Sequence, residues 1–202
     1  MPTKENIIAK AVELFNEKGI EYGGLRELAS ILNMRVSNIT YYFPTKDHLV
    51  LAIAEQLRTA NNPAFDTGSI SCVADFLNMY RTIFFNQHTY RCLLLSFVHL
   101  ITQNAVMAKD YKHVENKRRR KIINHLHALV KNGDLQKMND EQLELLTGNI
   151  TLLSRFWISE ARISYPDFSV DKLIEHYIKV LGNFLFGYAT AKGRRSIKNF
   201  LK

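Results

Sequence analysis

The sequence has few of the residues that break or cross-link a chain. Its 202 residues include nine glycines and four prolines, which argues against a loop-rich fold of many strands and turns. The two cysteines, Cys72 and Cys92, form no CxxC pair and offer no disulfide framework. These scarcities favour a helical protein of the cytoplasm, with reduced thiols.

Long hydrophobic runs are also missing. The stretch LLLSFVHLI at 93–101 is about half as long as the ~20 apolar residues that a membrane-spanning helix needs. The first residues, MPTKENII, lack the charged-then-apolar pattern of a secretion signal. With 47% hydrophobic and 23% charged residues, the composition is that of an ordinary globular protein. We therefore expect no membrane partner.

Catalytic and metal-binding motifs are absent as well. The chain has no G-x-S-x-G elbow, no P-loop and no G-x-G-x-x-G fingerprint, the motifs of nucleophile and nucleotide chemistry. His125 and His127 are two residues apart, so a helix would direct them to different sides. We therefore expect the protein to bind no cofactor and no metal. We also expect that it is not an enzyme, since a helical-bundle enzyme would need a catalytic constellation that the sequence lacks.

The most informative stretch is residues 24–48, GLRELASILNMRVSNITYYFPTKDH. Its apolar residues first recur with the spacing of one short helix, and Asn33 then suits the left-handed backbone of a tight turn. A second short helix is predicted from about Arg35 to Tyr42, where Pro44 stops it. Its inward anchors are Met34, Ile39 and Phe43. Two short helices joined by a tight turn form a helix-turn-helix, which presents its second helix to the DNA major groove.

Flanking helices supply the core that two short helices cannot bury alone. Upstream, TKENIIAKAVELFNEKG predicts an amphipathic helix with Thr3 as its N-cap and Gly19 as its C-cap. Downstream, Thr45 can cap a helix that runs through KDHLVLAIAEQLR to Arg58. The predicted inward residues of these two helices are Ile7, Ile8, Ala11, Val12, Phe15, Leu49, Ile53 and Leu57.

This order of motifs resembles the DNA-binding domain of the TetR family of bacterial repressors. The matching features are the LF-x-E-K-G end of the first helix, the L-R-E-L-A start of the second and the Y-F-P-[ST]-K-[DE] exit from the third. The similarity covers roughly the first quarter of the chain. Gly23 and Gly24 replace the hydroxyl residue that usually starts the second helix of the family, and the third helix also departs from the usual pattern. The DNA sequence recognised therefore cannot be transferred from a relative.

Net charge is not the basis for predicting DNA binding. The chain carries a formal charge of +8, but residues 1–60 hold seven Lys and Arg against seven Asp and Glu. The placement of individual residues around the third helix is more informative. The residues predicted to contact DNA are Lys4, Arg26, Arg35, Val36, Ser37, Asn38, Thr40, Tyr41, Tyr42, Thr45 and Lys46.

Side-chain chemistry divides these residues by role. Asn38 can make a paired contact to adenine, and Val36 can pack against a thymine methyl. Arg35 suits either a guanine or a phosphate. The resemblance implies that Tyr41 and Lys46 contact phosphates, which set the register of the complex but not its sequence.

Several of these residues have structural alternatives. Tyr42 is equally compatible with a place in the core beside Phe43. Arg26 and Glu27 fit a solvated helix face. The basic run at 117–121, which could contact an acidic ligand or a phosphate, fits such a face better.

The best candidate for a domain boundary is the segment 59–71, TANNPAFDTGSIS. We predict a DNA-binding domain over 1–60 and a second domain over 61–202. Five more helices are predicted beyond the boundary, at about 72–88, 90–104, 107–131, 139–163 and 170–191, followed by a loosely docked basic tail. The predicted fold is therefore all-α with about nine helices.

The last two long helices have wider apolar arcs than one core needs. Their spare faces fit a two-fold contact with a second copy, and the resemblance implies the same dimer, a four-helix bundle. The alternative is that these arcs are buried within one chain. The predicted dimer residues are Leu153, Phe156, Trp157, Ile174, Ile178, Leu181 and Leu185.

Aromatic and polar residues are mixed in the middle helices. The resemblance implies a small-molecule pocket in the second domain, and such pockets are mostly apolar with a few placed polar groups. The alternative is a plain core, which is more often what an aromatic stripe at helical spacing forms. The predicted pocket residues are Phe76, Tyr80, Phe84, Phe97, His99, Gln103 and His125.

Together these features predict a homodimeric transcriptional regulator that binds a palindromic DNA operator and is released from it by a small-molecule effector. Repression is the favoured outcome, because a bound operator blocks polymerase. The rival hypothesis is a helical small-molecule carrier whose helix-turn-helix is vestigial.

Overall fold

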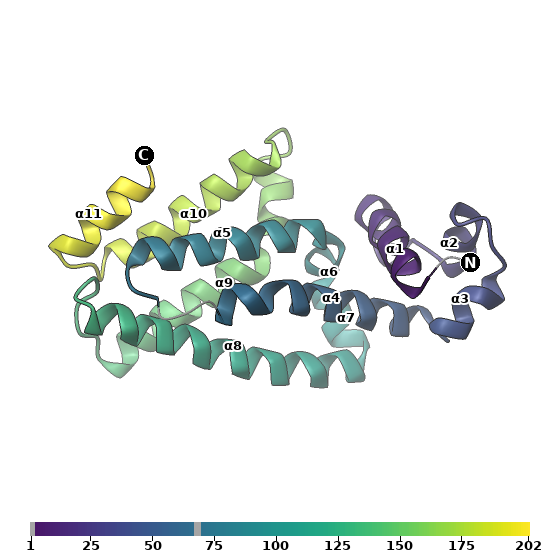
Figure 1. Ribbon diagram of the computed structural model, residues 1–202, viewed down its shortest axis with the longest axis horizontal. Helices are drawn as coiled ribbons and strands as arrows, with labels where there is room; N and C mark the ends of the chain where they lie inside the picture. The colour runs from purple at the N-terminus through teal and green to yellow at the C-terminus, as the bar shows by residue number, and fades with distance from the viewer. Residues whose placement is uncertain (1–2, 67–69) are drawn as a thin grey trace.

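A computed structural model describes residues 3–66 and 70–202, and these residues form eleven α-helices and no strand (Figure 1). The predicted all-α class is confirmed. The helices are α1 (Lys4–Lys18), α2 (Leu25–Ile31), α3 (Val36–Tyr42), α4 (Lys46–Asp66), α5 (Val73–Thr89), α6 (Arg91–Leu95), α7 (Phe97–Gln103), α8 (Ala105–Lys131), α9 (Asp140–Ser164), α10 (Val170–Phe186) and α11 (Ala191–Phe200).

The molecule is elongated, with two parts joined by α4 (Figure 1). At one end, α1 to α3 and the first turns of α4 form a small unit that we call the head. The remaining helices and the rest of α4 form a longer bundle that we call the core, and α11 lies at its far end (Figure 1).

The local signals in the head match the structure. The Thr3 hydroxyl accepts a hydrogen bond from the Asn6 N–H at 3.4 Å and caps α1. Gly19 ends α1 with φ of 90°, and Asn33 takes φ of 50° in the turn between α2 and α3. Each of these residues adopts a conformation that its residue type favours or tolerates.

The helix that joins the two parts runs farther than predicted. The sequence predicted an end at Arg58, whereas α4 continues to Asp66 with Pro63 inside it. Packing explains the difference: Asn86 donates from its side chain to the Ala60 carbonyl and to the Asn61 Oδ1, both at 3.0 Å. These contacts hold the first part of the polar segment 59–71 in the helix. Residues 67–69 of that segment lie outside the described residues.

Two other segments differ from the predicted nine helices. The stretch 90–104 is divided into α6 and α7 at Ser96, whose hydroxyl donates to the Glu21 carboxylate at 2.9 Å. The tail forms α11, whose Ile197 is buried. The backbone oxygen of Asp134 explains this docking, because it accepts the Thr190 N–H at 3.0 Å, and a Cβ on Gly193 would lie 2.0 Å from it.

Substitutions of the two glycines before α2 are expected to change stability in opposite directions. Gly23 is buried, and a Cβ there would lie 2.6 Å from the Phe15 ring, whereas nothing lies within 4 Å of a Cβ on Gly24. Gly24 is the N-cap of α2 and provides no side-chain cap. We expect Gly23→Ala to lower the free energy of unfolding by about 1–3 kcal/mol through overpacking. Gly24→Ser should raise it by roughly 0.5 kcal/mol by capping the helix and restricting the unfolded chain.

Urea denaturation of the two variants checks this pair. If Gly23→Ala leaves the unfolding midpoint unchanged or raises it, the packing of Phe15 against Gly23 is not what requires a glycine there.

Candidate nucleic-acid interface and small-molecule cavity

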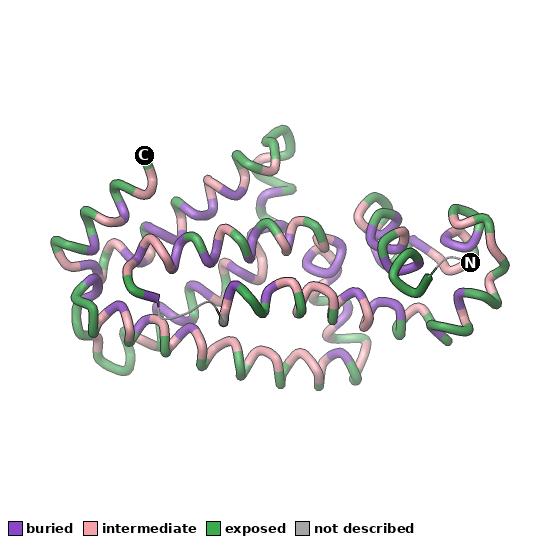
Figure 2. Tube along the Cα trace, viewed as in Figure 1, coloured by how far each residue is buried: buried purple, intermediate pink, exposed green. Residues whose placement is uncertain are grey.

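Helix α3, the second helix of the helix-turn-helix, has a single buried residue that anchors it to the head. Ile39 is buried in α3, with Phe43 buried just after it, and the remaining α3 residues are partly or fully exposed (Figure 2). Ser37 and Asn38 face solvent, and the Tyr41 side chain is 81% exposed. A short helix fixed by apolar anchors thus presents hydroxyl, amide and phenol groups to its surroundings.

The other residues predicted on α3 divide between surface and packing roles. Arg35 is exposed at the N-cap, and Val36 is partly buried against the core of the head. The Thr40 hydroxyl donates to the Ser37 carbonyl at 3.3 Å. Tyr42 is exposed and meets Tyr41 edge-to-face at 5.1 Å between ring centroids, so it lies outside the core.

One of the basic residues that flank α3 does not extend into solvent. Lys46 turns back into the head, where its ammonium donates to the Glu21 carbonyl at 3.2 Å and lies 5.8 Å from the centre of the Phe15 ring. Burial lowers the pKa of Lys46. In this structure the Lys46 side chain joins the loop before α2 to the start of α4, and its phosphate contact stays a prediction.

The remaining predicted contacts lie on the surface of the head. The Thr45 hydroxyl accepts the His48 N–H at 3.4 Å and so caps α4. Lys4 is exposed, with its ammonium 5.7 Å from the centre of the Phe43 ring. Arg26 is exposed, while the neighbouring Glu27 pairs with Lys18.

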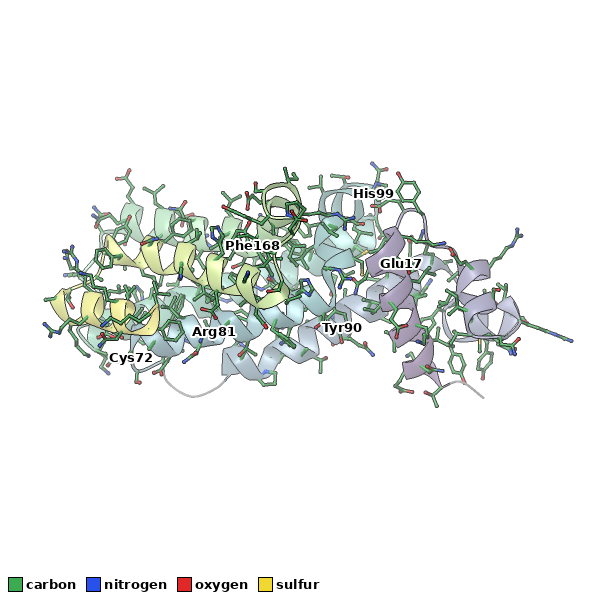
Figure 3. The ribbon with its side chains drawn as sticks, turned by 90° about the horizontal axis from the view of Figure 1, so that it is seen from above. Glu17, Cys72, Arg81, Tyr90, His99 and Phe168 are labelled. Carbon is green, nitrogen blue, oxygen red and sulfur yellow. The ribbon has the colours of Figure 1, made fainter. Side chains whose placement is uncertain are left out.

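A second connection holds the head against the core. The Asn16 side chain on α1 donates to the Thr89 carbonyl at 2.8 Å and accepts the Cys92 N–H at 3.0 Å. These are the last carbonyl of α5 and an N–H in the first turn of α6, groups that a helix end leaves without a partner. Figure 3 shows Glu17 and Tyr90, neighbours of these residues, on the two sides of the junction. No sequence signal marked Asn16, because its partners are distant in the chain.

A cavity of about 130 Å³ lies inside the core, lined by parts of α4, α5, α6, α7, α8 and α9. Most of the surface of its wall is apolar. The lining residues are Ala54, Leu57, Arg58, Asn61, Gln87, Leu93, Leu94, Phe97, Leu100, Ile101, Met107, Asp110, Tyr111, Val114, Glu115, Arg118, Ile122, Thr151, Ser154 and Arg155.

Charged groups in this wall are paired with one another. Arg58 contacts Asp110 at 3.2 Å. Arg155 donates to the Tyr111 hydroxyl and to the Glu115 carboxylate, both at 2.9 Å, and Tyr111 donates to Glu115 at 2.9 Å. Burial raises the pKa of Tyr111 to about 12, so the phenol remains a donor. The cavity therefore combines an apolar body with a nearly charge-balanced polar side.

Of the predicted pocket residues, only Phe97 lines this cavity. Phe76, Tyr80 and Phe84 instead stack in a row, with ring centroids 5.0 and 5.8 Å apart, and the row continues to Trp157 4.9 Å from Phe84. These three aromatic residues therefore belong to the hydrophobic core, which was the alternative interpretation.

The other three predicted pocket residues also lie outside the lining. His99 and Gln103 are exposed on α7. His125 packs against the Phe76 ring, and burial lowers its pKa. A usable signal was present on α8, where Met107, Tyr111, Val114, Arg118 and Ile122 recur at helical spacing.

The predicted dimer residues are mostly buried within the single chain. Trp157, Ile174, Ile178, Leu181 and Leu185 belong to the core, and Leu153 and Phe156 are partly buried. The first five are thus covered by the chain's own helices, which was the alternative interpretation, and their part in a dimer stays a prediction.

A different stripe of α9 is exposed. Leu145 is 56% exposed, Leu152 58% and Ile163 82%. These residues follow one another along the helix at intervals of two and three turns, so they share a face.

Two further features of the described chain bear on function. None of its helices is both long and apolar enough to cross a bilayer. Its histidine, cysteine and acidic side chains form no group of three that could hold a metal ion.

Comparison with known families matches both parts of the chain. Residues 7–53 match a model described as bacterial regulatory proteins of the tetR family, and residues 51–197 match the TetR model described as a bacterial transcriptional repressor. A probable HTH-type transcriptional regulator of Bacillus subtilis, YttP, is 30% identical over 113 residues. That alignment covers 54% of this chain and 55% of the relative, so the chain spans about half the length of the curated relative it matches.

Solved structures share the fold. A TetR-family transcriptional regulator from Marinobacter aquaeolei is 18% identical with a TM-score of 0.89, over 100% of this chain and 98% of the other. PfmR, a TetR-family regulator from Thermus thermophilus, is 15% identical with a TM-score of 0.66, over 87% and 96% of the two chains. A γ-butyrolactone receptor is 16% identical with a TM-score of 0.66, over 98% and 94%.

Proposed function

Because the chain belongs to the TetR family of bacterial transcriptional regulators, we propose that it is a homodimeric repressor that a small molecule releases from a palindromic operator. The family is one of regulators and not of enzymes, in agreement with the sequence analysis. The proposed site of action is the cytoplasm, where bacterial DNA lies.

The observation that carries the proposal is the exposed face of α3. Ser37, Asn38 and Tyr41 project from a helix that Ile39 and Phe43 fix to the head. A helix of this kind fits the major groove, where an Asn amide can pair with the two adenine edge groups and a Tyr hydroxyl can reach a phosphate. Since the head is neutral overall, we expect its specificity to come from these contacts rather than from bulk charge.

Two heads are needed because one short helix contacts only a few base pairs. A two-fold dimer doubles the contacted sequence and requires an inverted repeat, with half-sites about one helical turn apart. The exposed stripe of Leu145, Leu152 and Ile163 on α9 supports a self-complementary contact.

Helix α4 connects the cavity to the head. Ala54, Leu57, Arg58 and Asn61 line the cavity, and the same helix begins four residues after α3 ends. A volume of about 130 Å³ is close to that of the ~150 Å³ cavity that holds a benzene molecule. A larger ligand must displace the wall, including α4, and so favours a conformer with differently placed heads. Release requires that the ligand bind the two conformers with different affinity.

Small-molecule binding is compatible with this fold, since one similarly folded protein is described as a γ-butyrolactone receptor. For the present chain, the apolar cavity with a charge-balanced polar side fits a small, largely apolar effector with one or two hydrogen-bonding groups.

Selection of random duplex DNA by the purified full-length protein, at physiological salt, tests the proposal directly. An enriched inverted repeat supports a two-fold DNA-binding protein. Weak, salt-sensitive binding without enrichment, persisting after refolding to remove any co-purified ligand, would instead favour a carrier with a vestigial helix-turn-helix.

The amide of Asn38 is expected to discriminate one base pair. Asn38→Ala should weaken binding to the selected repeat and abolish the preference at one position of each half-site, a loss of about 1–3 kcal/mol per contact. Binding titrations against single-base variants of the repeat measure this. Asn199→Ala on α11, exposed at the far end of the core, is the matched control. Unchanged preference in the Asn38 variant would mean that α3 is not the recognition helix.

The exposed stripe of α9 is expected to form the dimer contact. A charge at Leu152 would be buried without a partner, so Leu152→Glu should raise the dimer dissociation constant at least roughly tenfold. Sedimentation velocity over a concentration series measures the change. Val106→Glu, at an exposed aliphatic position on α8, is the control. Equal behaviour of the two variants would contradict a dimer built on α9.

The Asn16 contact is expected to fix the orientation of the head. Asn16→Ala removes two hydrogen bonds between α1 and the core, each worth roughly 0.5–1.5 kcal/mol. The variant should tolerate changes in half-site spacing that the native dimer rejects, while its preference within each half-site stays the same. Binding to repeats with one base pair added or removed measures this, with Glu17→Ala as the neighbouring control. A spacing preference identical to that of the native protein would argue against this role of Asn16.

A further inference from the structure

A second hollow lies on the other side of α6 from the cavity. This cleft, of about 400 Å³, is formed by the end of α5, α6, the end of α9 and the start of α10, and it shares no lining residue with the cavity. Trp157 and Ile158 are buried in its wall, and Tyr165 and Phe168 add two rings 5.0 Å apart. Its size is that of a small-molecule site.

The charges lining the cleft are all of one sign. Arg91 and Arg162 line it, no carboxylate does, and neither guanidinium forms an ion pair within the described residues. The only hydrogen bond of the Arg91 guanidinium there is to the His88 carbonyl, at 3.4 Å. Burial, and then the charge of Arg91, lowers the pKa of His88, so the positive charge at neutral pH belongs to the two arginines.

This arrangement contrasts with the cavity. There Arg58 faces Asp110 and Arg155 faces Glu115, so an anion would have to displace an existing partner. In the cleft, a carboxylate would meet two guanidinium groups that have no anionic partner, and charge-assisted bonds to arginine are the stronger class of hydrogen bond.

From these contacts we infer that the cleft is a second small-molecule site, which binds a carboxylate carried on a flat aromatic body. Arg91 and Arg162 hold the carboxylate, while the rings of Trp157, Tyr165 and Phe168 cover the aromatic body. The cleft uses none of the residues that line the cavity or that form the proposed DNA-binding face.

The chain carries its own reporter for this site, because Trp157 is its single tryptophan. Incorporation of 5-fluorotryptophan gives one ¹⁹F resonance, at the wall of the cleft. The full-length protein is titrated with naphthalene-2-carboxylate and, separately, with the neutral naphthalene-2-carboxamide, by ¹⁹F NMR and by calorimetry. We expect the carboxylate to shift the resonance and to bind at least roughly tenfold more tightly than the amide.

Three variants separate the charge from the apolar wall. Arg162→Gln should weaken binding of the carboxylate roughly tenfold and leave the amide unchanged. Phe168→Ala should weaken both probes, because it removes part of the wall that both contact. Arg195→Gln, an exposed arginine on α11, makes the same change of charge and should alter neither.

Melting curves establish that each variant is folded. Three results would overturn the inference: equal affinity for the two probes, no effect of Arg162→Gln, or a Trp157 resonance that stays fixed while calorimetry records saturation.

Discussion

One amide side chain bonds the head to two helices of the core. Asn16 satisfies the last carbonyl of α5 and an N–H in the first turn of α6 at the same time, so one residue of α1 completes the ends of two core helices. Without it, α4 would be the main tether of the head, assisted by the Ser96–Glu21 bond. Attachment at several points on different helices restricts how the head can rotate, and Asn16 supplies two of the hydrogen bonds involved.

The short helix α6 lies between the head, the cavity and the cleft. Cys92 bonds to the head, Leu93 and Leu94 line the cavity, and Arg91 and Leu95 line the cleft. Five residues therefore face three environments at once. A ligand that displaces this helix from one side would also shift its residues on the other two sides, because packed helices move as rigid bodies rather than deform continuously.

Features set by neighbours in sequence were predictable, and features set by distant contacts were not. Thr3 caps α1 with its own hydroxyl, and Gly19 and Asn33 take the positive φ that their residue types tolerate, so these roles could be read directly from the chain. The continuation of α4 through Pro63 depends on Asn86, and the lining of the cavity depends on how five other helices pack around α8. Periodicity revealed that α9 and α10 are amphipathic, but a wide apolar arc does not say which part is covered by the chain's own helices.

An unbroken helix between head and cavity also has a geometric consequence for how this chain can change over time. Each residue of α4 turns the helix by about 100° and advances it by about 1.5 Å. Inserting or deleting one residue between Leu49, which is buried in the head, and Ala54, at the cavity, would therefore swing α1 away from Thr89 and Cys92. The number of residues in this segment is therefore constrained. Variation in length is expected to be confined to the connections between other helices.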